Sequence, residues 1–277
     1  VAAFTLGVQP TGIIAVAVLL AGGRPIVRII VTRARTVGMW PVLLPLAAAG
    51  FVVLTVVFAD QTLAAVREAT AVRTAIGPAQ PWYTENLRYF YLILPTTDAA
   101  LSRRFGILTT MACLFPSILL LLRRKRIPGI ATGPVWRLMG VIFATLFLLT
   151  FAPTKWIHHF GLFAAVGAAM AAVATVLLGP TVLRAARNRM AFLAVVFFVL
   201  ALCFASTNGF WYVSSYGVPF NDSSPHWGPV TVSAVLFALC LLTAGYASWL
   251  HLAPTSRAEP RITHLLTVAP VPMGKPF

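Results

Sequence analysis

Residues 135 to 178, VWRLMGVIFATLFLLTFAPTKWIHHFGLFAAVGAAMAAVATVLL, contain two long apolar runs on either side of a short polar turn. Each run has about 18 residues, which is the length with which an α-helix crosses the hydrocarbon core of a bilayer. Pro153 ends or kinks the first helix and Gly161 opens the second. The stretch therefore predicts two membrane-crossing helices joined by a tight turn.

The same pattern is repeated along the chain of 277 residues. Hydrophobic residues make up 59% and charged residues only 10%, and the mean hydropathy is +0.88, which is far more apolar than a water-soluble domain requires. The expected spans are 4–22, 41–59, 105–122, 135–152, 161–178, 190–207 and 230–250. We predict an all-α, polytopic membrane helix bundle.

The formal net charge of +15 raises the question of a nucleic-acid partner, which the positions of the charges argue against. The basic residues gather in short loops between apolar runs, at 24–35, 123–137 and 183–189. The acidic residues fall mainly in the other connections, at 60–104, 153–160 and 208–229. By the positive-inside rule the basic loops are cytoplasmic and the other connections face outward. We expect a multi-pass protein of the cell membrane that binds no nucleic acid.

The first outward connection is predicted to contain a helix on the membrane surface. Leu63, Val66, Ala69, Val72 and Ile76 recur at helical spacing. The charged residues of this segment lie off that face, as an interfacial amphipathic helix requires.

Aromatic and polar residues follow one another in the outward connections. The first connection carries Trp82, Tyr83, Glu85, Asn86 and Arg88, and the third carries Asn208, Trp211 and Asn221. Stacking rings interleaved with hydrogen-bonding groups are typical of sugar-binding surfaces. An aromatic belt at the membrane interface explains the rings equally well, so both interpretations stay open.

The turn between the two quoted runs carries Lys155, Trp156, His158 and His159. A zinc site is disfavoured, because adjacent histidines rarely ligate one metal and the turn has no carboxylate; we expect no metal and no cofactor. Side chains that merely reach to the lipid headgroups are the second reading. The favoured reading is an anion site, with Lys155 as a fixed charge, the histidines as donors and Trp156 as a wall. An anion at the outer surface beside aromatic residues suggests a polyprenyl phosphate head group.

Several stretches resemble the mycobacterial arabinosyltransferases, the family targeted by ethambutol, and look nearest to its B paralogue. They are LGVQPTGIIAVAVLLAGGRP, VVFADQTL, WYTENLRYFYLILPT, RRKRIP, WRLMGVIFATLFLLTFAPTKWIHHFGLFAAVGAAMAA and WYVSSYGVPFN. The resemblance implies a GT-C membrane glycosyltransferase that moves arabinose from decaprenylphosphoryl arabinose to the arabinan of arabinogalactan, with inversion. It also implies a paralogous subunit as partner, an acyl carrier protein on the cytoplasmic face, and a donor and drug pocket at the turn of residues 155–159.

The family's general-base aspartate and carbohydrate-binding module have no counterpart in this sequence. We therefore expect a fragment that has no catalytic residue of its own and is inactive alone, with the base supplied from upstream. Two other classes are kept as alternatives. A transporter would require broken helices and ionisable groups near the bilayer midplane; Gln9 and Pro10 in the first span are the nearest feature, and Gln9 is uncharged. A non-catalytic scaffold subunit would explain the basic loops but not the turn.

Overall fold

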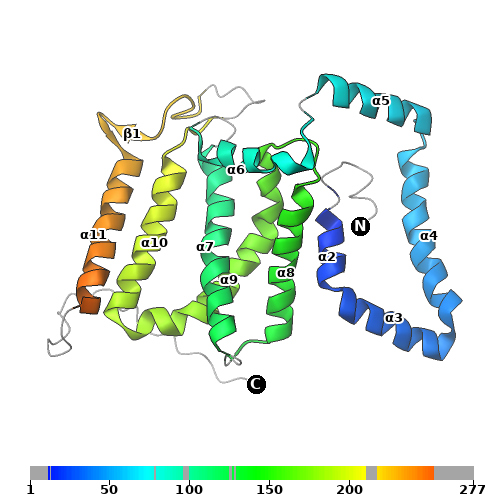
Figure 1. Cartoon of the computed structure of the whole chain (residues 1–277), viewed down its shortest axis with the longest axis horizontal. Helices are drawn as coiled ribbons and strands as arrows, with labels where there is room; N and C mark the ends of the chain where they lie inside the picture. The colour runs from blue at the N-terminus through cyan, green and yellow to red at the C-terminus, as the bar shows by residue number, and fades with distance from the viewer. Residues whose placement is uncertain are drawn as a thin grey trace.

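The computed structural model describes residues 12, 14–77, 79–95, 100–124, 127, 129–209 and 217–252. Long helices stand side by side, and shorter elements cover one end of them (Figure 1). The long helices are α4 (Met39–Val57), α7 (Leu101–Arg123), α8 (Thr132–Leu149), α9 (Phe163–Arg184), α10 (Ala186–Phe204) and α11 (Val232–Leu252). All six are long and apolar enough to cross a membrane, and a bent pair of helices near the N-terminus raises the number to as many as seven within these residues. The prediction of an all-α membrane bundle is confirmed.

The core of the bundle lies between α7, α8 and α9. Along α9 the buried residues are Phe163, Gly167, Met170, Ala174 and Leu177. Their spacing alternates between four and three residues, which keeps one face of a helix turned toward its neighbours in left-handed packing. Small residues on that face let the backbones approach closely, as is common between membrane helices. This three-helix core supports the elements at the end of the bundle.

Gly167 of α9 lies in close contact with Thr110 of α7. A Cβ atom added at Gly167 would clash with the Thr110 hydroxyl oxygen. That hydroxyl donates a hydrogen bond of 2.8 Å to the carbonyl of Gly106, one turn earlier in α7. The hydroxyl therefore has its hydrogen-bond partner within its own helix and needs none from α9, which lies against it.

The N-terminal part of the chain differs from the prediction. Of the expected span at 4–22, residues 1–11 and 13 lie outside the described residues. The remainder forms α2 (Ala15–Ala21), which is followed after a bend of 70° by α3 (Gly23–Val37). The basic stretch 24–35 was predicted as a loop, and that prediction is wrong. Its isoleucines recur at helical spacing between the arginines, so the segment can form a helix at the membrane surface without exposing apolar residues on every side.

The other basic connections are also shorter than predicted. α9 continues to Arg184 and α10 begins at Ala186, so a single extended residue, Ala185, separates the two helices. α7 runs to Arg123 and α8 begins at Thr132. Arg123, Arg137, Arg184, Arg187 and Arg189 therefore lie on the spanning helices themselves.

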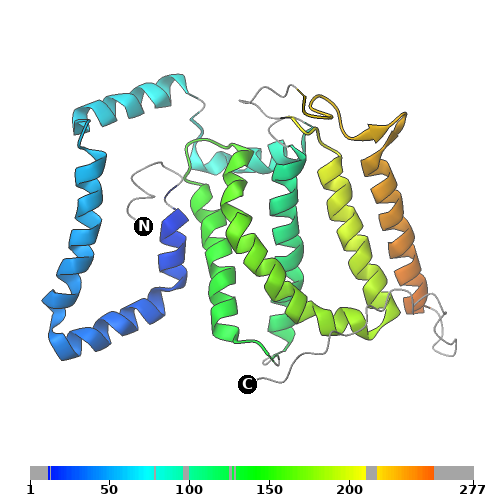
Figure 2. The ribbon, with the colours of Figure 1, turned by 180° about the vertical axis from the view of Figure 1, so that it is seen from behind.

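The opposite end of the bundle is covered by short helices (Figure 2). They are α5 (Leu63–Ile76), η2 (Trp82–Thr84), α6 (Asn86–Ile93) and η4 (Ile157–Leu162), with a small antiparallel pair, β1 (His226–Trp227) and β2 (Val230–Thr231). α5 confirms the predicted helix over these residues, and the Thr62 hydroxyl caps it by accepting from the Ala65 backbone amide at 3.2 Å.

Arg104, near the start of α7, ties this covering layer to the bundle. Its side chain is only 3% exposed. Its guanidinium donates to the carbonyls of Ile93 and Leu94 at the end of α6, at 2.8 and 2.7 Å, and to Leu202 of α10 at 2.8 Å. The carbonyls at these helix ends have no partner within their own helices, so the arginine satisfies them.

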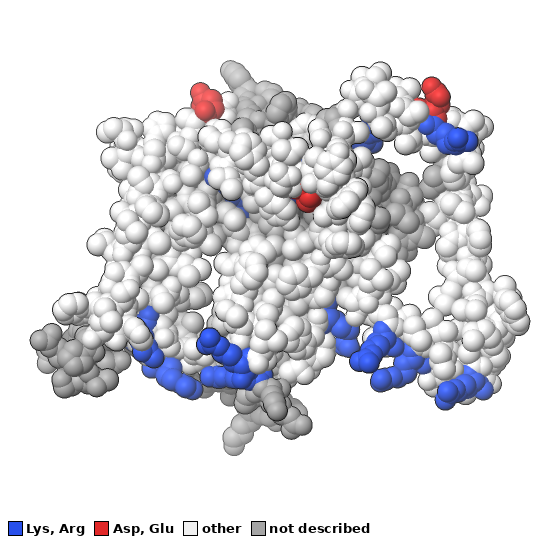
Figure 3. All heavy atoms as spheres, viewed as in Figure 1, with Lys and Arg blue, Asp and Glu red and all other residues white. Residues whose placement is uncertain are grey.

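The two ends of the molecule differ in charge, because most Lys and Arg lie at one end and the opposite end carries both acidic and basic residues. On the face seen in Figure 3, Lys and Arg gather along the lower edge, from the base of the bundle to α3, while the visible Asp and Glu lie in the upper half. The separation follows the long axes of the spanning helices, as expected for a protein oriented across a membrane.

Substituting Gly167→Ala should destabilise the protein, because the new methyl group has no room beside Thr110. Overpacking of this kind typically costs about 1–3 kcal/mol, or a fall of roughly 2–10 °C in the thermal unfolding midpoint in detergent. Gly179→Ala on the same helix is the matched control, since a Cβ atom added there meets nothing within 4 Å. Adding Thr110→Ala to Gly167→Ala should recover most of the loss. An unchanged midpoint in Gly167→Ala would contradict the close packing.

Candidate functional site

The turn after α8 is held by the ammonium group of Lys155. α8 ends at Leu149, and Lys155 Nζ donates to the carbonyl oxygens of Thr150 and Ala152 at 2.6 and 3.1 Å. Carbonyls at the C-terminal end of a helix lack partners within the helix and favour a cation. Lys155 is only 5% exposed, so its first role is to close this helix end.

Glu85 supplies the negative charge that this buried lysine needs. One carboxylate oxygen lies 3.1 Å from Lys155 Nζ, and the other lies 2.6 Å from Nε of Arg88. Glu85 and Arg88 are three residues apart where α6 begins, which places both on one face of the helical turn. The ion pairs join the layer formed by α6 to the turn after α8, about 70 residues later in the chain.

Arg88 is fully buried, and all three nitrogen atoms of its guanidinium group donate hydrogen bonds. The acceptors are both Glu85 oxygens (2.6 and 3.4 Å), His159 Nδ1 (2.7 Å), and the carbonyl oxygens of Trp156 (2.6 Å), Thr154 (3.1 Å) and Leu149 (3.3 Å). The guanidinium also lies 6.0 Å from the centre of the Phe160 ring. A buried guanidinium is tolerated only when its donors are satisfied in this way.

Two further contacts close the turn. The Gln80 amide donates to the carbonyl of Pro153 at 2.7 Å, and the Tyr89 ring lies 5.8 Å from that of Phe160. Burial, and then the negative charge of Glu85, raise the pKa of the Tyr89 phenol. The phenol therefore stays neutral at physiological pH and can offer a hydrogen bond without adding charge.

Trp156, His158 and His159 lie on the outer side of this cluster. Trp156 is extended, and its ring stacks on that of His158, with centroids 6.1 Å apart and planes at 27°. His158 is exposed and its ring centroid lies 4.5 Å from that of His159, which is half-buried. His158 and His159 belong to the short 3-10 helix η4, which begins directly after Trp156. The arrangement presents polar ring atoms beside a cluster whose two cations outnumber its one anion.

The remaining predicted site residues are not all gathered here. Trp82, Tyr83 and Asn86 are exposed on η2 and the start of α6, close in sequence to Glu85. Asn208 bonds within its own loop. Its backbone N–H donates to the carbonyl of Phe220 at 2.8 Å, and its side-chain amide donates to the carbonyl of Pro219 at 3.3 Å. Asn221 is half-buried in that same loop. Trp211 lies outside the described residues.

Sequence reasoning assigned Glu85 and Arg88 to sugar binding and missed their role as the counter-ion and the hub of the turn. The spacing of three residues was a usable signal for a local ion pair. Their link to residues 149–159 was not visible, since no local pattern reports which distant backbone carbonyls a guanidinium will meet.

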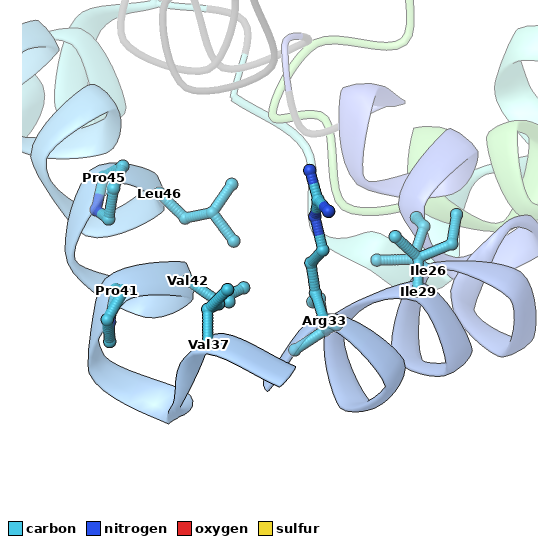
Figure 4. Close-up of a pocket in the computed structure, with 9 residues that line it drawn as sticks. Ile26, Ile29, Arg33, Val37, Pro41, Val42, Pro45 and Leu46 are labelled. Atoms are coloured by element: carbon cyan, nitrogen blue, oxygen red, sulfur yellow. The ribbon is translucent and has the colours of Figure 1, made fainter. Parts of the chain in front are cut away.

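A hollow of about 720 Å³ lies elsewhere, between α3 and α4 on the basic side (Figure 4). Its lining is Ile26, Ile29, Ile30, Arg33, Val37, Pro41, Val42, Pro45 and Leu46. These walls are apolar apart from Arg33 and suit an aliphatic chain. Among the described residues there is also no group of three or more His, Cys, Asp or Glu that could hold a metal ion. The turn after α8 is therefore the candidate site.

Comparison with known proteins gives consistent matches along the chain. Residues 1–253 match the family described as "Mycobacterial cell wall arabinan synthesis protein". Probable arabinosyltransferase B of Mycobacterium tuberculosis H37Rv is 66% identical over 276 residues, which is 100% of this chain and 25% of that protein. Probable arabinosyltransferase C of Mycolicibacterium smegmatis is 40% identical over 251 residues, which is 91% of this chain and 23% of that protein.

A solved structure shares the fold. The cryo-EM structure of arabinosyltransferase EmbB from Mycobacterium smegmatis has a TM-score of 0.75 and 60% identity, and the match covers 97% of this chain and 23% of that one. The chain thus spans about a quarter of the length of the relatives that it matches.

Proposed function

The chain belongs to the family of mycobacterial cell wall arabinan synthesis proteins and has the GT-C membrane fold of its structural relative, and on that premise we propose that it forms the donor-binding part of a membrane arabinosyltransferase. The proposed donor is a polyprenyl-phosphate arabinose, and the proposed acceptor is the growing arabinan of arabinogalactan. The observation that carries the proposal is the cluster of Glu85 with the buried Arg88 and Lys155, which bonds to the Trp156 carbonyl and to His159 at the end of the bundle.

The proposed reaction is an inverting transfer. A base outside this chain takes the proton from an acceptor hydroxyl, the hydroxyl oxygen attacks the anomeric carbon, and the bond from that carbon to the phosphate oxygen breaks. The electron pair leaves with the polyprenyl phosphate, so negative charge grows on the phosphate. Donors and cations that are already oriented there stabilise the transition state more than the bound substrate.

The geometry supports a division of roles among the predicted residues. Lys155 contributes positive charge from a buried position, because its ammonium already bonds two carbonyls and Glu85. His158 is exposed and adjoins Trp156, so these two are the proposed contacts for the phosphate and for the sugar or first isoprenoid unit. The exposed Trp82, Tyr83 and Asn86 are proposed to extend the sugar-binding surface.

We propose that the turn faces the outside of the cell membrane and that α3 faces the cytoplasm. The separation of charge along the bundle supports this orientation. In a variant without the native cysteines, a membrane-impermeant thiol reagent applied to whole cells should label Glu68→Cys on α5. It should label Arg28→Cys on α3 only after the membrane is permeabilised. The reverse labelling would overturn the orientation.

His158→Ala in the full-length protein should lower turnover by roughly one to three orders of magnitude, as when one charge-stabilising donor is removed. Trp156→Ala should act mainly on KM, because stacking contributes similarly before and during the reaction. Steady-state transfer from a polyprenyl-phosphate arabinose donor measures both. His226→Ala is the matched control, because His226 is an exposed histidine of the β1–β2 pair. A correctly inserted His158→Ala enzyme with normal turnover would contradict the proposed site.

The basic face is proposed to dock an acidic partner, an acyl carrier protein, while a paralogous subunit completes a dimer within the membrane. Topology alone also explains basic residues on this side, so the docking needs its own test. Charge reversal at Arg123, Arg124 and Arg126 should weaken co-purification of the acidic partner in a salt-sensitive way. Reversal at Arg67 and Arg73 of α5 is the control. If both sets of variants recover the partner equally, the docking proposal is wrong and the basic residues have only a topological role.

A further inference from the structure

The bond between Arg88 and His159 determines which nitrogen of the histidine carries a proton. A guanidinium offers N–H groups and has no acceptor. Arg88 Nη1 lies 2.7 Å from His159 Nδ1, so Nδ1 must accept with its lone pair. His159 is therefore the neutral tautomer whose proton is on Nε2, because a proton on Nδ1 would oppose the N–H of the arginine.

Arg88 cannot adjust its position to suit another tautomer. It is fully buried, and its other N–H groups are held by both oxygens of Glu85 and by the carbonyls of Leu149, Thr154 and Trp156. Glu85 is in turn held by Lys155. The orientation of the guanidinium is set by these contacts, so His159 must conform to it.

The Nε2–H group of His159 is the remaining polar group of this network. His159 is half-buried, and within the described part of the chain Nε2 has no hydrogen-bond partner. It lies next to the exposed His158 and behind it are two cations, Arg88 and Lys155, against one carboxylate. An N–H donor in a net positive setting suits an oxygen of an anionic group, above all a phosphate.

We infer that Arg88 is a positioning residue that fixes His159 as a neutral Nε2–H donor to a phosphate oxygen of the bound ligand. This inference rests on the proposed function, because it takes the phosphate to be that of the polyprenyl-phosphate donor. The inference assigns the hydrogen bond to the phosphate to His159. Lys155 could make that bond only by giving up its contacts with Glu85 and with the carbonyls after α8. The same arrangement keeps His159 from taking a proton from the ligand through Nδ1.

Two substitutions at His159 separate the outward donor from the inward acceptor. Asn places an amide oxygen near the position of Nδ1 and so keeps the acceptor for Arg88, but it does not reach the position of Nε2. Gln places an amide N–H near the position of Nε2 and gives up the acceptor. If His159 only satisfies Arg88, Asn is the better substitute. If it donates to phosphate, Gln is.

The test measures the affinity of full-length detergent-solubilised protein for farnesyl phosphate, with inorganic phosphate titrated in parallel, and the thermal midpoint of each variant. We expect His159→Asn to weaken farnesyl phosphate binding at least about tenfold, the discrimination expected for one charge-assisted hydrogen bond, and His159→Gln to bind more tightly than His159→Asn. The same ranking with inorganic phosphate identifies the phosphoryl group as what is recognised. A ranking seen with farnesyl phosphate alone shows that the lipid chain is needed to place it. Gln binding no better than Asn overturns the inference.

Arg88→Lys tests the positioning role, because it keeps the charge but loses the planar fork. It should weaken binding, and combining it with His159→Asn should add little further loss, since the two residues act through one bond. Additive losses would overturn the role of Arg88. Wild-type protein that binds neither probe and transfers no arabinose rejects the proposed function instead. If the wild-type protein and His159→Asn bind farnesyl phosphate equally tightly, the inference is rejected but the proposed function is not.

Discussion

A guanidinium without solvent contact is the constraint on which the outer end of this molecule depends. Removing a charge from water is unfavourable by several kcal/mol unless every polar group around it is paired. Arg88 meets that requirement by drawing together segments that are far apart in the chain: the start of α6, the end of α8 and the turn before α9. The helix ends gain partners for their carbonyls, and the arginine gains acceptors. Each side of the arrangement needs the other.

The bundle below provides the rigidity that such a network needs. α7, α8 and α9 pack around side chains that recur at three and four residues, and Gly167 brings two of these helices into close contact. Helices outside this core, such as α4, present apolar side chains outward along their length. In a membrane such surfaces meet lipid tails or other membrane helices at little expense, so they need not be buried within the chain. Precise packing is concentrated where the site is supported.

The sequence was informative wherever one physical rule decides the structure. Length and hydropathy identified the spanning helices, and apolar spacing identified α5 with its ends at Leu63 and Ile76. The same spacing existed in residues 24–35 but was outweighed by the charge of its arginines, and so α3 was missed. Lys155 was recognised as an unusual residue for its place, but not as a partner of Glu85. Ion pairs between distant segments depend on how the helices pack, which local patterns do not encode.

The nature of the Arg88 acceptors has a consequence for how this region can vary. Three of them are main-chain oxygens, of Leu149, Thr154 and Trp156. Every amino acid supplies that oxygen, so a substitution of Trp156, which is the half-buried member of the three, can alter the surface of the turn without removing the bond from Arg88. The side chain at the rim of the turn can therefore change independently of the hydrogen bonds beneath it.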